Sequence, residues 1–268
     1  MTDKRPIDDL LYVMAQLRDP DNGCPWDREQ TFETIAPYTI EEAYEVADAI
    51  DQGDRTQLED ELGDLLFQVV FYAQMSRETG GFDFEDVARR IATKMRDRHP
   101  HVFGDAEERS SAAQSVAWET HKAQERDRRA QTSGQPPSAL DGVARALPAL
   151  MRAQKLQKRA AREGFDWPDL GPVLAKIREE LGELEAEIAA DAPEARLRDE
   201  AGDLLFACVN LARHLGVDAE IALRGTNDKF ERRFRSVEQG LEAKGKTLSE
   251  SDLAEMDALW DEAKTAER

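Results

Sequence analysis

Two pairs of carboxylates stand at helical spacing in the C-terminal half of the chain. Glu180 and Glu183 are three residues apart, and so are Glu200 and Asp203. Because an α-helix turns by about 100° per residue, each pair shares one helix face, beside an apolar stripe. If the two helices pack through these stripes, the pairs face each other and repel unless a cation lies between them. Oxygen ligands without Cys or His suit a hard cation, so the sequence predicts a Mg²⁺ site, with Mn²⁺ as an alternative.

The N-terminal half repeats this pattern and predicts a second metal site, formed by Glu42, Glu45, Glu61 and Asp64. Solvated acidic helix faces are the alternative, and the Glu-Glu-x-x-Glu pattern alone does not exclude it. Metal binding is favoured because a matching Glu-x-x-Asp pair follows in both halves. A di-iron centre is disfavoured because it requires Glu-x-x-His on two helices, and none of the four histidines has a glutamate three residues before it.

Basic residues accompany the C-terminal carboxylates. Lys176 lies on the predicted stripe of Glu180, and Glu179 lies at its edge. A further basic cluster comprises Lys229, Arg232 and Arg233. Such a cluster can balance phosphate oxygens that a metal does not reach, and surface salt bridges are the alternative. Trp260 is interpreted either as a stacking platform for a nucleobase or as a core or interface anchor.

The elements that must position these residues are helices. Apolar residues recur at helical spacing in both halves, for example at Leu197, Ala201, Leu204, Leu205, Cys208 and Leu211. Alternation with a period of two, which indicates strands, is scarce. The sequence therefore predicts an all-α fold in which each half resembles a four-helix bundle.

An internal repeat sets the domain organisation. The segment ELGDLLF at residues 61–67 recurs as EAGDLLF at residues 200–206. Between the two copies runs a stretch rich in Gly, Pro and polar residues, which is typical of a linker. We therefore expect an N-terminal domain over residues 1–130, a linker over 131–139 and a C-terminal domain over 140–268.

Composition limits the possible partners. The 268 residues include 36 Lys and Arg but 56 Asp and Glu, which gives a formal net charge of −20. Long-range repulsion from phosphate backbones argues against binding a nucleic-acid polymer or an anionic membrane. No stretch approaches the roughly 18 apolar residues that a membrane span requires, and there is no signal-peptide pattern at the N-terminus. The two cysteines form no disulfide framework, so we expect a cytoplasmic protein.

The sequence resembles the MazG family of nucleoside triphosphate pyrophosphohydrolases, and in particular its two-domain bacterial members. In the first copy the resemblance rests on GCPWD, APYTIEEAYEV, ELGDLLFQVVFYAQ and RHPHVF. In the second copy it rests on ALPALMRAQKLQKRA, EGFDW, EELGE, DEAGDLLFACVNLARHL and KFERRF. The resemblance implies an all-α, Mg²⁺-dependent enzyme that hydrolyses NTPs or dNTPs to the monophosphate and pyrophosphate, and that forms homodimers.

The resemblance also assigns residues. It implies metal ligands at Glu180, Glu183, Glu200 and Asp203. It implies nucleotide contacts at Lys176, Glu179, Arg196, Lys229, Arg232, Arg233 and Trp260. It makes the C-terminal copy the main catalytic one, since the first copy has Tyr38 where the second has Lys176.

The mechanism expected from these assignments is attack by a metal-activated water on the α-phosphorus of the substrate. Glu179 or Glu180 would accept the proton of this water, and Lys229 and Arg233 would help to balance the charge of the departing pyrophosphate. A nucleotide-sensing or partner-binding helical scaffold with little turnover is the alternative function. Base and sugar preference are not apparent from the sequence.

Overall fold

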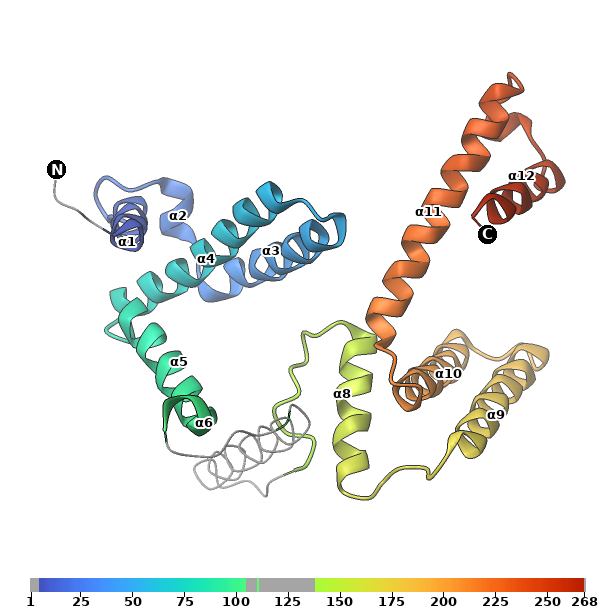
Figure 1. Ribbon diagram of the computed structural model, residues 1–268, viewed down its shortest axis with the longest axis horizontal. Helices are drawn as coiled ribbons and strands as arrows, with labels where there is room; N and C mark the ends of the chain where they lie inside the picture. The colour runs from blue at the N-terminus through green and yellow to red at the C-terminus, as the bar shows by residue number, and fades with distance from the viewer. Residues whose placement is uncertain (1–4, 105–109, 111–137, 268) are drawn as a thin grey trace. The chain divides into compact units, whose positions relative to one another are not determined.

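The computed structural model describes residues 5–104, 110 and 138–267, and its regular elements there are helices without a strand (Figure 1). The chain divides into two compact units, residues 1–121 and 122–268. The all-α, two-domain prediction is confirmed. The predicted domain limits at 130 and 140 stay a prediction, because residues 131–137 of the expected linker lie outside the described residues. No described helix is both long and apolar enough to cross a membrane.

The first unit is organised around a pair of long helices. Helix α3 (Phe32–Gln52) and helix α4 (Arg55–Glu78) pack along each other, and Gly53 joins them with a left-handed φ of 71°. Helices α1 (Pro6–Leu17) and α5 (Phe84–Arg98) pack on α4, while α2 (Pro25–Glu29) and α6 (Pro100–Phe103) are short. The buried core of this unit comprises Met14, Ile35, Val70, Phe71 and Met75.

The second unit repeats the helix pair. Helix α9 (Leu170–Ala189) and helix α10 (Glu194–His214) pack along each other, and α8 (Ala149–Arg162) packs on α10. Helix α11 (Ala219–Ala243) follows and contacts α8, α10 and α12 (Leu253–Ala266), with the short 3₁₀ helix η1 (Leu248–Glu250) between α11 and α12. Val237, Leu241 and Leu259 form a small core between α11 and α12.

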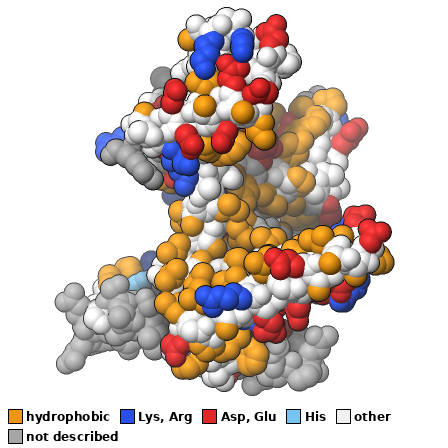
Figure 2. All heavy atoms as spheres, turned by 90° about the vertical axis from the view of Figure 1, so that its right-hand side faces the viewer, with side chains coloured by type: hydrophobic (Ala, Val, Ile, Leu, Met, Phe, Trp, Pro, Cys, Tyr) orange, Lys and Arg blue, Asp and Glu red, His pale blue; other side chains and the backbone are white. Residues whose placement is uncertain are grey.

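Both helix pairs leave apolar side chains exposed. On α9 and α10, Leu181, Ile188 and Leu205 are 44%, 61% and 59% exposed. Figure 2 shows hydrophobic side chains gathered at the surface of the helices that face the viewer. Monomeric soluble proteins rarely expose large contiguous apolar patches, so this surface needs an explanation beyond the fold of one chain.

Candidate active site

Three carboxylates from two helices converge in the second unit. Glu180 on α9 and Glu200 and Asp203 on α10 each offer an oxygen, and these oxygens lie within 4.8 Å of one another. Glu180 and Glu200 are buried, whereas Asp203 is exposed. The packing of α9 along α10 brings three of the four predicted ligands together. Oxygen atoms alone make up this group, which fits a divalent hard cation.

Glu183, the fourth predicted ligand, lies one turn beyond Glu180 on α9 and is exposed. It is not part of the group of three. Its environment is nevertheless coupled to that group, since burial and the charge of Glu180 raise the pKa of Glu183. A cation close to Glu180 and Glu183 would offset the electrostatic repulsion between these two carboxylates.

Two cations of the chain neutralise the buried carboxylates. Lys176 Nζ lies 2.7 Å from Glu180 Oε1 and 2.8 Å from Glu179 Oε1. On the other helix, Arg196 Nη2 lies 3.0 Å from Glu200 Oε1 and 2.6 Å from Glu187 Oε1. The hydrogen bonds to Glu179 and Glu180 raise the pKa of Lys176. Lys176 therefore stays charged beside the carboxylate group, where an anionic phosphate can also reach it.

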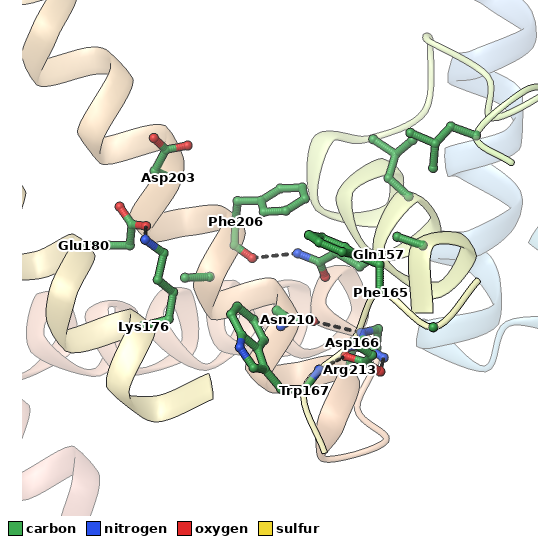
Figure 3. Close-up of a pocket in the computed structure, with 15 residues that line it drawn as sticks. Gln157, Phe165, Asp166, Trp167, Lys176, Glu180, Asp203, Phe206, Asn210 and Arg213 are labelled. Atoms are coloured by element: carbon green, nitrogen blue, oxygen red, sulfur yellow. Dashed lines mark hydrogen bonds and ion pairs between the residues drawn. The ribbon is translucent and has the colours of Figure 1, made fainter. Parts of the chain in front are cut away.

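A pocket of about 660 Å³ opens beside this group (Figure 3). In that view Lys176, Glu180 and Asp203 lie at one end, Trp167 and Phe206 lie in the middle, and polar side chains lie beyond them. The volume is in the range typical of small-molecule sites.

The sequence reasoning missed most residues of this pocket. The signal was present on α10, where Asp203, Phe206 and Asn210 follow the i, i+3, i+7 spacing of one helix face. A polar Asn on a face that carries large apolar residues indicates either a buried hydrogen bond or a ligand contact. By contrast, Gln157 on α8 and Trp167 in the α8–α9 loop are separated from Asn210 in sequence, so no local pattern links them.

The remaining predicted nucleotide contacts form a cluster of their own on α11 and α12. Arg232 Nε donates to Glu267 Oε1 at 2.8 Å, and Arg233 Nη2 lies 2.7 Å from Glu267 Oε2. The Arg233 guanidinium also lies 5.8 Å from the centre of the Trp260 ring. Lys229 lies on the same helix, α11. None of these residues lines the pocket. The structure therefore brings Lys176 and Arg196 to the carboxylates and pairs Arg232 and Arg233 with Glu267.

The first unit carries a similar carboxylate group. Glu42 and Glu45 on α3 and Glu61 on α4 offer oxygens within 4.8 Å of one another. Asp64 lies outside this group of three, but burial and the charges of Asp64 and Glu45 raise the pKa of Glu42. A cavity of about 110 Å³ in this unit is lined by α1, α4 and α5 and includes none of these carboxylates. The first copy thus has the acidic group without an adjoining pocket of comparable size among the cavities described.

Comparisons with known proteins agree with the internal repeat. The family model described as "MazG nucleotide pyrophosphohydrolase domain" matches residues 30–103 and 172–237. The chain is 55% identical over 262 residues to the nucleoside triphosphate pyrophosphohydrolase of Escherichia coli strain K12, covering 97% of this chain and 98% of the relative. It is 44% identical over 258 residues to the Thermotoga maritima protein named nucleoside triphosphate pyrophosphohydrolase/pyrophosphatase MazG, covering 96% and 95%.

Both matched segments contain a carboxylate group described above, so the repeat, the acidic clusters and the family match coincide. The chain therefore belongs to the MazG family of nucleotide pyrophosphohydrolases, and it carries the family's domain twice.

Proposed function

We propose that this enzyme hydrolyses nucleoside triphosphates to the nucleoside monophosphate and pyrophosphate at the carboxylate group of its second unit, with Mg²⁺ as the metal. The observation that carries the proposal is the convergence of Glu180, Glu200 and Asp203, beside Lys176, at one end of a ligand-sized pocket. Family membership supports the reaction class, and this geometry supports its proposed place in the second unit.

The residues that would hold the metal are Glu180, Glu200 and Asp203, with Glu183 one turn away on α9. A divalent cation held there lowers the pKa of a bound water and offsets phosphate charge. Asp203 is the exposed member of the group, so it faces an incoming substrate most directly. The buried position of Glu180 and Glu200 fixes their orientation before a metal or substrate arrives.

Glu179 is the candidate general base, with Glu180 as the alternative. The side chain of Glu179 is 56% exposed, and only its Oε1 accepts the bond from Lys176. Its second oxygen can therefore accept a proton from an attacking water. Lys176 can then exchange its contacts with these carboxylates for a phosphate oxygen as negative charge develops on the substrate.

We propose that Arg196, Lys229, Arg232, Arg233 and Trp260 contribute further contacts to the nucleotide. Arg196 is already at the carboxylate group through Glu200. The other four residues lie on α11 and α12, where Arg232 and Arg233 pair with Glu267, so they would serve a nucleotide reached from a second copy of the chain or after a rearrangement of α11. Either route is consistent with the pairing of Arg232 and Arg233 to Glu267, a carboxylate that a phosphate can replace.

We also propose a C₂ homodimer. The apolar side chains of Leu181, Ile188 and Leu205 are exposed on the α9–α10 pair, and a second copy could cover them with the same surface. Although α8 packs on α10, the described helices of this unit leave these three side chains exposed, and a four-helix bundle around them needs two further helices. Two pairs packed face to face would supply them.

The reaction is tested by measuring products from purified protein with each NTP and dNTP, in Mg²⁺, in Mn²⁺ and with a chelator. We expect monophosphate and pyrophosphate in equal amounts, and no turnover after the metal is removed. Release of orthophosphate would contradict the proposed point of cleavage. Tight nucleotide binding without turnover would instead support a nucleotide-sensing scaffold.

A further inference from the structure

A charged bridge joins the end of α9 to the start of α10. Arg196, in the first turn of α10, donates from Nη2 to Glu200 Oε1 at 3.0 Å and to Glu187 Oε1 at 2.6 Å. Its Nε donates to the same Glu187 oxygen at 3.2 Å. Glu187 lies in the last turn of α9, so one guanidinium connects this turn to a carboxylate of the proposed metal group. Two of these three hydrogen bonds, including the shortest, go to Glu187.

Glu187 is the partner that holds Arg196 in place. The side chain of Arg196 is 53% exposed, so packing alone does not fix it, and a long exposed side chain loses rotamer freedom when it is held in one geometry. The side chain of Glu187 is only 24% exposed, and its backbone oxygen accepts a hydrogen bond of 2.9 Å from the loop that follows α9. The hydrogen bond to Glu187 is also the main cause that raises the pKa of Arg196.

The bridge orients the carboxylate of Glu200. This side chain is 11% exposed, and its Oε1 accepts the hydrogen bond from Arg196. A carboxylate has two oxygens, so a bond that fixes Oε1 orients the whole group and leaves Oε2 available to a cation. Residues that hold a metal ligand from behind commonly change metal affinity by ten- to a hundredfold when they are removed. A fixed Arg196 therefore matters to metal binding at Glu200.

We propose that Glu187 is a positioning residue of the second copy, which holds Arg196 against Glu200 and thereby orients this carboxylate for the metal ion. The inference rests on the proposed function, because it takes Glu200 as a metal ligand. Glu187 lies outside the group of three carboxylates and acts on that group through Arg196. Its removal should therefore weaken metal binding only as long as Arg196 is present.

The first copy lacks both members of this bridge. In the aligned repeats Ala49 occupies the position of Glu187, and in both copies the backbone oxygen of this residue accepts a hydrogen bond from the following loop, at 3.2 Å and 2.9 Å. Gln57 occupies the position of Arg196, and its Nε2 donates to Glu61 Oε1 at 3.4 Å. A neutral donor without a carboxylate anchor thus replaces the arginine. The charged bridge is a feature of the second copy and is not required by the helix pair itself.

The test measures Mn²⁺ binding to the nucleotide-free, full-length protein by calorimetry. The part of the binding that Asp203→Asn removes belongs to the second copy. Glu187→Gln should raise the Kd of this part by about tenfold, and Glu187→Asp, which keeps the charge, should restore most of the affinity. The matched control is Glu185→Gln, which removes the same charge at an exposed position of α9 and should stay within about twofold of wild type. In turnover, the Mg²⁺ concentration for half-maximal rate should rise in Glu187→Gln by more than kcat falls.

A double variant tests whether Glu187 acts through the arginine. Arg196→Gln gives the second copy the residue of the first, and in this background Glu187→Gln should change the Mn²⁺ Kd by less than about twofold. A tenfold change that persists there, an unchanged Kd in Glu187→Gln, or an equal rise in Glu185→Gln would overturn the inference.

The proposed function fails in a different way. Wild-type protein that shows these Kd shifts but releases no pyrophosphate would contradict the proposed reaction and leave the role of Glu187 intact. Mn²⁺ binding that Asp203→Asn does not change would overturn both the proposed metal site and this inference.

Discussion

The two copies hold similar carboxylate groups in different surroundings. In the second unit Lys176 Nζ lies 2.7 Å from Glu180 Oε1. The pocket that these two residues line also includes Asn210. In the first unit Tyr38 takes the position of Lys176, and its ring lies 6.0 Å from that of Trp26 in a T-shaped contact. Phe71 takes the position of Asn210 and is buried, with the Arg18 guanidinium 5.4 Å from the centre of its ring.

This difference shows that the carboxylate group forms in both copies although the residues around it differ. The helix pair alone is enough to gather three carboxylates, since both units do so. Catalysis on a nucleotide also needs a cation for the phosphates and room for the rest of the substrate. The second copy provides both, whereas the first copy uses the corresponding positions for aromatic packing. We therefore expect the activity to reside mainly in the second copy, with the first copy serving structure, assembly or regulation.

The largest expected effect comes from the matched ligand variants Asp203→Asn and Asp64→Asn. Asp203→Asn should lower kcat by about a thousandfold or more, because it weakens the carboxylate group that we propose to hold the metal. Asp64→Asn should keep most of the wild-type rate. Pyrophosphate release measures both, and circular dichroism should show unchanged helicity. Inactivation by Asp64→Asn with Asp203→Asn still active would invert our assignment of the two copies.

Exchanging the residue beside the carboxylates should sharpen the comparison. Lys176→Tyr gives the second copy the residue of the first and should lower kcat/KM by about a hundredfold, because a charged contact to phosphate is lost. Tyr38→Lys should add little activity, since Phe71 still fills the position that Asn210 has in the second copy. Steady-state kinetics on the two variants measures this. In the double variant Tyr38→Lys/Asp203→Asn the second copy is inactivated. Rapid turnover by this variant would show that the missing cation alone limits the activity of the first copy.

The exposed apolar faces can be compared in the same way. Leu205 on α10 and Leu66 on α4 occupy equivalent positions in the repeats and are 59% and 39% exposed. If the proposed dimer buries the second copy's face, Leu205→Glu should shift the protein from dimer to monomer at micromolar concentration, because a buried charge is unfavourable at an apolar interface. Leu66→Glu should have the smaller effect. Light scattering measures the mass, and a monomeric wild type would rule out the dimer.

The smallest expected effect concerns the ion pairs that tie the helices of each copy together. Asp166 pairs with Arg213 in the second unit, and Arg18 pairs with Glu78 at 2.7 Å in the first. The pKa of Asp166 in the folded protein is about 2, below its ordinary value, so its contribution to stability is full at neutral pH. That contribution is lost as the pH falls from about 4 towards 2.

Asp166→Asn should therefore lower the free energy of unfolding near pH 7, with a difference from wild type that shrinks below about pH 4. Urea unfolding at several pH values measures this difference. Glu78→Gln is the matched variant in the first copy, since the hydrogen bond from Arg18 lowers the pKa of Glu78 as well. A difference for Asp166→Asn that grows on acidification would contradict the cause that we assign to its lowered pKa.

Much of the fold and half of the candidate site could be predicted from spacing. Glu180, Glu200 and Asp203 were identified because helical periodicity fixes which side chains share a face, and the apolar stripes indicated which faces would meet. Arg196 pairs with Glu200, whereas its contact with a nucleotide stays a prediction. The pocket residues beyond Lys176 and the carboxylates were not predicted, because Gln157, Trp167 and Asn210 come from three separate segments and meet only through packing.

The sequence by itself thus determined the helices, the duplication and the acidic pairs, since each of these depends on residues a few positions apart or on direct repetition. Tertiary structure decided that the carboxylate group of the second copy adjoins a pocket of ligand size, because that depends on how α8 and the α8–α9 loop pack against α10. It also decided that Arg232 and Arg233 pair with Glu267 on α12 and do not line the pocket. A charge pattern along a helix fixes which face a side chain occupies, whereas its partner depends on which other helix packs on that face.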